Sequence, residues 1–214
     1  MKNFTDQLTD MIIQTRDTSI NHPFIHQLST GELPLATFRY YLIQDNHYLT
    51  AFNQLHQVIA GHLSLQDGET LRHLGEGEDA ARQKMHQEIG LENEELTTTP
   101  VAPTAYAYIT HMYYQLNTYG KEAAVSGLLP CYWLYSEIAQ QLIHRQSTRP
   151  LYQEFFDSYS AADFTSSTQA MIDIVNRQAK AADRKTRQQM KRAFEISCHY
   201  EKAFWQMAYT KEQW

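Results

Sequence analysis

The stretch FRYYLIQDNHYLTAF, residues 38–52, contains the spacing that decides the fold. Phe38, Tyr41, Asp45, Tyr48 and Phe52 follow one another at intervals of three or four residues, which places them on one face of an α-helix. The pattern predicts a long helix over residues 34–63, opened by a proline. Asp45 is a carboxylate in the middle of an otherwise aromatic stripe, so it needs a partner, a raised pKa or a ligand.

The same helical period recurs on both sides of this stretch, and alternating strand-like runs do not occur. Helices are expected over residues 3–19, 21–28, 34–63, 66–89, 104–119, 121–146, 149–159, 163–182 and 183–209. The connections are too short to mark a domain boundary. We therefore predict one all-α, single-domain helical bundle over residues 1–214.

The composition excludes several classes of protein. A net charge of −6 and the lack of a basic stripe argue against nucleic-acid binding. No apolar run approaches the ~20 residues that a membrane span needs, and the N-terminus has no signal-peptide pattern. The chain has 2 cysteines in helical patterns, which suits a reducing cytoplasm. The histidines have no diagnostic metal-site spacing, so no metal and no cofactor are expected.

Cys131 lies in the apolar run GLLPCYWLY, residues 127–135, directly after Pro130. If Pro130 is the first residue of a helix, Cys131 falls in the first turn, where backbone N–H groups favour negative charge. A thiol placed there can have a lowered pKa and act as a nucleophile. The alternative is a small buried residue that fills a gap in the core, which is the commoner role of a free cysteine.

A second carboxylate lies on an apolar face near the C-terminus. Phe194, Cys198, Glu201, Phe204 and Trp205 share one side of the expected last helix, with Glu201 inside the stripe. Either acid alone could form a buried salt bridge or lie at the rim of the core. Two acids and a cysteine on three separate apolar faces are harder to explain by packing.

Tyrosine is abundant, with 14 residues, and several lie on inward-facing stripes. Tyr108 shares a face with Met112, Tyr135 lies one turn beyond Cys131, and Tyr159 ends a short aromatic segment. Most tyrosines of this kind are ordinary core residues. A flat ligand with polar edges would offer them both stacking surface and hydrogen-bond partners.

Four motifs in these helices resemble the TenA family, also called thiaminase II or aminopyrimidine aminohydrolase. The first is HPF at residues 22–24, followed by Gly31, LP at 33–34 and FRYYLIQDNHYL at 38–49. The others are PTAYAY at 103–108, LPCYWLY at 129–135 with Glu137, and YEKAFW at 200–205 with MAY at 207–209. The resemblance covers nearly the whole chain, and Cys131 places it with the branch of the family that carries the thiol.

This resemblance implies a haem-oxygenase-like bundle used without haem, assembled as a homotetramer. It implies hydrolysis of 4-amino-5-aminomethyl-2-methylpyrimidine, and of thiamin, to 4-amino-5-hydroxymethyl-2-methylpyrimidine in thiamin salvage. Cys131 matches the family's nucleophile and Glu201 its acid/base. The residues that match the pyrimidine-binding groups are Asp45, Tyr48, Tyr108, Tyr135, Tyr159 and Phe204.

The chemistry of these side chains agrees with that assignment. Asp45 can accept a proton from the exocyclic amine and engage the neighbouring ring nitrogen, while aromatic walls stack on the ring. A thiolate can add to the electron-poor heterocycle. Glu201, with a pKa raised by apolar neighbours, can protonate the leaving amine and then deprotonate water. We expect Asp45, Cys131 and Glu201 to face one enclosed cavity.

Two other functions remain open at this stage. One is a non-haem di-iron or cofactorless oxygenase on the same bundle, which would need several inward His and Glu ligands. The other is a non-catalytic regulatory protein, although no helix-turn-helix or basic face supports DNA contact.

Overall fold

The computed structural model describes residues 3–74 and 76–214, and within these residues every regular element is a helix. The first half comprises a 3-10 turn, Thr5–Gln7, and six helices: α1 (Thr9–Ile20), α2 (Pro23–Thr30), α3 (Leu35–Ala60), α4 (Leu65–Leu74), α5 (Glu76–Glu88) and α6 (Asn93–Thr98). The second half comprises α7 (Pro103–Tyr119), α8 (Lys121–Leu142), α9 (Pro150–Ser160), α10 (Ala162–Ala181) and α11 (Arg184–Thr210). The predicted all-α class is confirmed.

Local chemistry explains several of the helix ends. Helix α2 starts at Pro23, after His22 accepts a hydrogen bond of 3.1 Å from the backbone N–H of Phe24. It ends at Gly31, whose φ of 86° is the left-handed conformation that glycine tolerates best. At the other end of the chain, Asp183 caps α11 by accepting a hydrogen bond of 2.7 Å from the Thr186 N–H.

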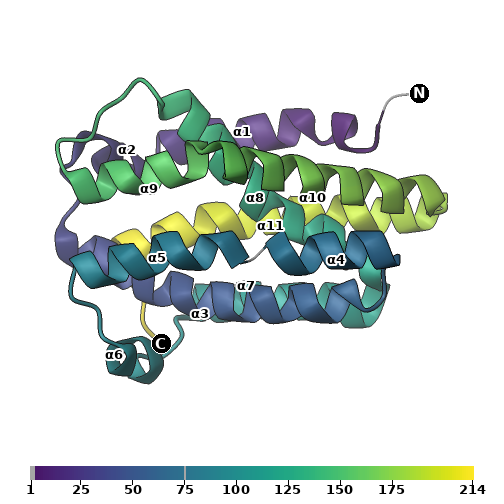
Figure 1. Ribbon diagram of the computed structural model, residues 1–214, viewed down its shortest axis with the longest axis horizontal. Coiled ribbons are helices and arrows are strands. Elements are labelled where there is room, and N and C mark those ends of the chain that lie inside the picture. Colours follow the sequence, from purple (N-terminus) through teal and green to yellow (C-terminus); the bar gives the residue numbers. More distant parts are fainter. Residues whose placement is uncertain (1–2, 75) are drawn as a thin grey trace.

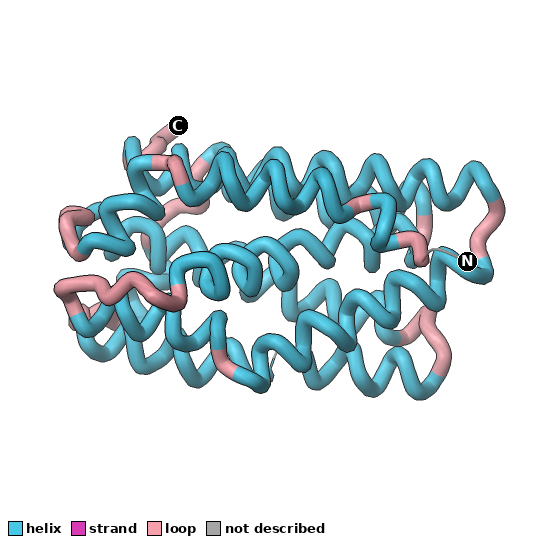
Figure 2. Tube along the Cα trace, turned by 90° about the horizontal axis from the view of Figure 1, so that it is seen from above, coloured by secondary structure: helices cyan, strands magenta, loops and turns pink. Residues whose placement is uncertain are grey.

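Helix α8 is the central element of the bundle. It packs against α11, α10, α7 and α1, and Figure 1 shows it crossing behind α10 in the middle of the molecule. Helices α3 and α7 lie together on one side, and α4 and α5 follow one another along the bundle next to α3 (Figure 1). The view turned by 90° shows the long helices running along a common direction, with the loops gathered mainly at the two ends (Figure 2).

The helix expected over residues 121–146 does not restart at Pro130, so the condition that placed Cys131 in a first turn is not met. Helix α8 begins at Lys121 and continues through Pro130 to Leu142, so Cys131 lies in mid-helix and not in a first turn. A proline inside a helix costs about 3 kcal/mol. Every residue from Ala123 to Tyr132 is buried, and the packing of this segment on all sides offsets that cost.

The expected helix over residues 66–89 also differs from the structure. It is divided into α4 and α5, and residue 75 between them lies outside the described residues. The division lets α5 pack against α9 as well as follow α4, which brings its last turns to the end of the bundle that holds α2 and α9.

Candidate active site

Three separate helices carry the two acids and the cysteine that the sequence singled out. Asp45 lies on α3, Cys131 on α8 and Glu201 on α11, and their exposed fractions are 4%, 8% and 2%. Burial of two carboxylates and a thiol in one bundle is costly unless other polar groups or a ligand compensate for it.

Aromatic rings connect these three residues. Tyr48 lies against Tyr108, with ring centroids 4.7 Å apart, and against Phe204 at 5.8 Å. Tyr135 lies against Tyr159, with ring centroids 4.7 Å apart. All five are residues that the motifs indicated, and they come from α3, α7, α8, α9 and α11.

Tyr41, which the sequence placed on the aromatic stripe but not among the binding residues, joins the two groups of rings. Its ring centroid lies 6.0 Å from that of Phe204, and its hydroxyl shares a hydrogen bond of 3.2 Å with the hydroxyl of Tyr135. The predicted aromatic residues therefore form one continuous cluster.

The electrostatic influence of the acids and the thiol reaches the same tyrosines. Burial raises the pKa of Tyr48 well above its usual value, and Cys131, Tyr108 and Glu201 raise it further. The pKa of Tyr135 is likewise raised well above its usual value by burial, and then by Tyr41, Glu201 and Asp45. Cys131 and Glu201 therefore act on Tyr48, and Glu201 and Asp45 act on Tyr135.

Glu201 has a defined hydrogen-bond partner in this region. The hydroxyl of Tyr108 donates to Oε1 of Glu201 over 2.7 Å. This contact orients the carboxyl group toward the aromatic cluster and links α7 to α11.

The hydroxyl of Tyr48 is buried and makes no hydrogen bond of standard geometry, and the hydroxyl of Tyr108 is its polar neighbour. An unsatisfied buried hydroxyl costs about 1–3 kcal/mol and is uncommon in a folded protein. Because this hydroxyl lies among the residues expected to hold a ring, a ligand with polar edges is a natural partner for it.

Asp45 is under two opposing influences. Burial raises its pKa to about 6, whereas Arg82 on α5 and a hydrogen bond from Tyr41 act to lower it. The Nε atom of Arg82 lies 3.9 Å from Oδ2 of Asp45. Arg82 was not predicted from the sequence. The available signal is its spacing of three and four residues from Met85 and His86, which places it on the inward face of α5.

The second cysteine has a different environment. Cys198 is buried on α11, and burial raises the pKa of its thiol to about 12, with a hydrogen bond to Thr15 opposing the shift. Such a thiol stays protonated at neutral pH, which is typical of a buried structural cysteine.

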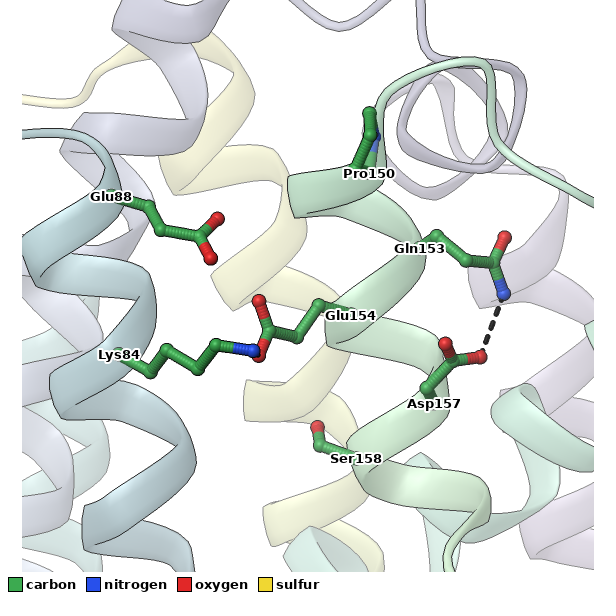
Figure 3. Close-up of a pocket in the computed structure, with 7 residues that line it drawn as sticks. All are labelled: Lys84, Glu88, Pro150, Gln153, Glu154, Asp157 and Ser158. Carbon is green, nitrogen blue, oxygen red and sulfur yellow. Dashed lines mark hydrogen bonds and ion pairs between the residues drawn. The ribbon is translucent and has the colours of Figure 1, made fainter.

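A surface cavity of about 550 Å³ lies outside this cluster, between α5 and α9. It is lined by Lys84, Glu88, Pro150, Gln153, Glu154, Asp157 and Ser158. Figure 3 shows Lys84 reaching across from α5 to Glu154 on α9, with which it forms an ion pair. The lining has no aromatic ring or thiol, so this cavity lacks the groups that the expected chemistry needs.

Neither of two further kinds of site is found in the described part of the chain. Among the side chains described, those of residues 3–74 and 82–214, no group of three or more His, Cys, Asp or Glu is arranged to hold a metal ion. In the same residues, no helix is both long and apolar enough to span a membrane.

The fold and the buried cluster define a class: all-helical proteins with a haem-oxygenase-like fold. A domain with that fold from Shewanella denitrificans OS217 superimposes with a TM-score of 0.72, 15% identity, and coverage of 96% of this chain and 92% of the other. The TenA homologue from P. horikoshii OT3 superimposes with a TM-score of 0.88, 25% identity, and coverage of 98% and 99%.

Comparison of sequences identifies the family within that class. The model of the TENA/THI-4/PQQC family matches residues 12–211, and the chain belongs to this family. It is similar to a Bacillus subtilis (strain 168) protein named aminopyrimidine aminohydrolase, with 31% identity over 99% of this chain and 92% of the relative.

Proposed function

We propose that this protein is an aminopyrimidine aminohydrolase, a C–N hydrolase of thiamin salvage. It hydrolyses 4-amino-5-aminomethyl-2-methylpyrimidine to 4-amino-5-hydroxymethyl-2-methylpyrimidine, and it also cleaves thiamin. Membership of the TENA/THI-4/PQQC family and the relative named for this activity support the reaction. The observation that carries it in this chain is the convergence of Asp45, Cys131 and Glu201 on one buried aromatic cluster.

In this proposal Asp45 binds the edge of the pyrimidine. One carboxylate oxygen accepts a hydrogen bond from the exocyclic amine, and the other shares a proton with the neighbouring ring nitrogen. A group with a pKa of about 6 is suited to this, because it can hold or release that proton near neutral pH. Tyr48, Tyr108, Tyr135, Tyr159 and Phe204 form the walls and rim that enclose the ring.

Cys131 and Glu201 carry out the covalent steps. The thiolate of Cys131 adds to the ring carbon next to the substituted position, and the displaced electron pair moves to a ring nitrogen, which takes a proton. The amine at position 4 then pushes its electron pair toward the side chain, and the C–N bond of the 5-methylene group breaks. Glu201 protonates the departing amine.

The second half-reaction reverses these movements of electrons. Glu201, now ionised, removes a proton from water as its oxygen bonds to the exocyclic methylene carbon. The electron pair returns through the ring, the ring nitrogen gives the proton that it took back to Asp45, and the bond to sulfur breaks. The hydroxymethyl pyrimidine and the Cys131 thiolate are then released. Glu201 ends protonated, so the catalyst is regenerated with a net consumption of one water.

The experiment that tests this proposal incubates the purified protein with the aminomethyl pyrimidine and, separately, with thiamin. Formation of hydroxymethyl pyrimidine and its loss in Cys131→Ser, but not in Cys198→Ser, is the expected result. The absence of product from the wild-type protein with both compounds contradicts the proposed reaction. Comparison of kcat/KM between the two substrates identifies the preferred one.

We further propose that the protein acts in the cytoplasm as a homotetramer. Tyr106 and Tyr114 on the outer face of α7 and Trp214 near the C-terminus are large apolar side chains left exposed in the single chain. Tyr106 and Trp214 lie edge to face with ring centroids 6.0 Å apart, so they form one surface that a second copy can cover. Light scattering coupled to size-exclusion chromatography gives the mass of the assembly.

A further inference from the structure

Helix α5 contributes a cation to the Asp45 site. The side chain of Arg82 is almost fully buried, with 6% of the residue exposed, and its Nε lies 3.9 Å from Oδ2 of Asp45. Burial of a guanidinium group costs several kcal/mol unless anionic or polar partners compensate for it. The position of Arg82 against a buried carboxylate therefore has a physical cause that goes beyond chain packing.

Polar contacts hold α5 against the bundle on both sides. One turn after Arg82, the ring of His86 is buried beside the backbone of Leu42, three residues before Asp45 on α3, and its Nε2 atom has no hydrogen-bond partner. On the outer side of α5, Lys84 forms an ion pair with Glu154 of α9, across the surface cavity (Figure 3). These contacts bring Arg82 to Asp45 at a fixed place along α3.

We propose that Arg82 is a positioning residue for the hydrolysis: it holds Oδ2 of Asp45 so that the carboxyl group faces the amine and ring nitrogen of the aminopyrimidine. This inference rests on the proposed function. Arg82 acts through Asp45 and takes no part in the covalent steps. The guanidinium group of Arg82 presents N–H donors to one side of the Asp45 carboxylate. The exocyclic amine of the aminopyrimidine presents an N–H donor to the other side.

The charge around Asp45 indicates why a cation is needed there. The titratable groups that face this region come from five helices: Arg82 on α5, Tyr41 on α3, Cys131 and Tyr135 on α8, Tyr159 on α9 and Glu201 on α11. Ionisation of any of these groups other than Arg82 adds negative charge, and Arg82 is the neighbour whose charge lowers the pKa of Asp45. Its removal therefore raises that pKa above about 6.

The experiment compares Arg82→Gln, Arg82→Lys and the matched control Arg177→Gln. Arg177 pairs with the buried Asp67 outside the aromatic cluster, so its replacement reproduces the loss of an Asp–Arg pair without touching the site. Each variant is assayed for kcat and KM with the aminomethyl pyrimidine from pH 5 to 8.5. The titration of the Asp45 carboxyl carbon is followed by ¹³C NMR, with its signal identified by its absence from Asp45→Asn.

In Arg82→Gln we expect the Asp45 signal to titrate about one pH unit higher, which corresponds to a tenfold change in proton affinity. The pH limb of kcat/KM set by Asp45 is expected to move by the same amount, with KM rising several-fold more than kcat falls. Arg82→Lys is expected to restore most of the shift, because it keeps the charge, and Arg177→Gln to leave the limb in place.

An Asp45 titration that is the same in Arg82→Gln and the wild type overturns the inference, as does an equal shift of the limb in Arg177→Gln. These results are distinct from a failure of the proposed function. The NMR titration does not depend on turnover, whereas failure of the function is a wild-type protein that forms no hydroxymethyl pyrimidine.

Discussion

Two buried aspartates, each paired with an arginine, have opposite roles in this bundle. Asp67 on α4 accepts a hydrogen bond of 2.9 Å on Oδ1 from Nε of Arg177 and one of 3.3 Å on Oδ2 from Gln178, and its Oδ1 forms an ion pair of 2.8 Å with Nη2 of Arg177. Asp45 on α3 contacts Arg82 over 3.9 Å, and burial raises its pKa to about 6.

The two carboxylates differ in how well hydrogen bonds and ion pairs compensate for their burial. Three donors at hydrogen-bonding distance compensate for the burial of Asp67, so its carboxylate ties α4 to α10 and stabilises the fold. Asp45 has less compensation, from Arg82 at 3.9 Å and a hydrogen bond from Tyr41, and in the proposed function it keeps hydrogen-bonding capacity for a ligand. The two buried thiols differ as well, because Cys131 acts on Tyr48 and Tyr108, whereas burial raises the pKa of the Cys198 thiol to about 12.

Replacement of the Cys131 thiol by a hydroxyl group has the largest expected effect on turnover. Cys131→Ser should lower kcat by a factor of about 10³ or more, because a hydroxyl group is a far poorer nucleophile at neutral pH. Pyrimidine binding, measured by calorimetry, should change little. Cys198→Ser is the matched control and should retain wild-type turnover; full hydrolysis by Cys131→Ser breaks the contrast between the two thiols.

Removal of the acid/base group has the next largest effect. Glu201→Gln keeps the shape and the hydrogen bond from Tyr108 but cannot transfer a proton, so kcat should fall by about 10²–10⁴ with a much smaller change in affinity. Steady-state kinetics separate the two quantities. An unchanged kcat would show that Glu201 only binds the substrate.

The paired variants Asp45→Asn and Asp67→Asn sharpen the comparison directly. Asp45→Asn should raise KM for the pyrimidine by about 10-fold or more, since loss of one charge-assisted contact costs about 1.5–3 kcal/mol. Asp67→Asn should leave kcat/KM near the wild-type value and lower the free energy of unfolding by about 1–3 kcal/mol. Steady-state kinetics and urea unfolding give kcat/KM and the free energy of unfolding for each variant. If Asp67→Asn lost activity and Asp45→Asn lost only stability, the assigned roles of the two aspartates would be refuted.

The sequence predicts the local features of the fold and the candidate site better than contacts between residues far apart in the chain. Three- and four-residue spacing identifies the helices and puts Asp45 and Glu201 on apolar faces, because both properties depend on neighbours along the chain. The pairing of Asp45 with Arg82 depends on how α5 packs against the bundle, which no local spacing reveals. Only the resemblance to a family assigned roles to the tyrosines.

Pro130 shows the same limit for secondary structure. Its local preference favours a helix start, and sequence reasoning followed that preference. Tertiary packing of α8 against its neighbours outweighs it, so the proline lies in mid-helix and Cys131 does not lie in the first turn of a helix.

The smallest effect concerns stability against pH and tests whether burial of Asp45 carries a cost. A carboxyl whose pKa is about 6 in the folded protein and 3.8 as its ordinary value binds more protons folded than unfolded between those values. Its contribution to stability is therefore complete below about pH 4 and is lost as the pH rises through 6, by up to about 3 kcal/mol.

His56 and His111 act in the opposite direction, because burial lowers the pKa of each to about 4, and they mask this loss in the wild-type protein alone. The difference between the wild type and Asp45→Asn cancels them, since both proteins keep these histidines. Asparagine resembles the protonated carboxyl, so the variant should match the wild type near pH 4 and become the more stable of the two by pH 7. Urea unfolding at both pH values measures this; a variant that is less stable at pH 7 would mean that Asp45, like Asp67, is held mainly for the fold.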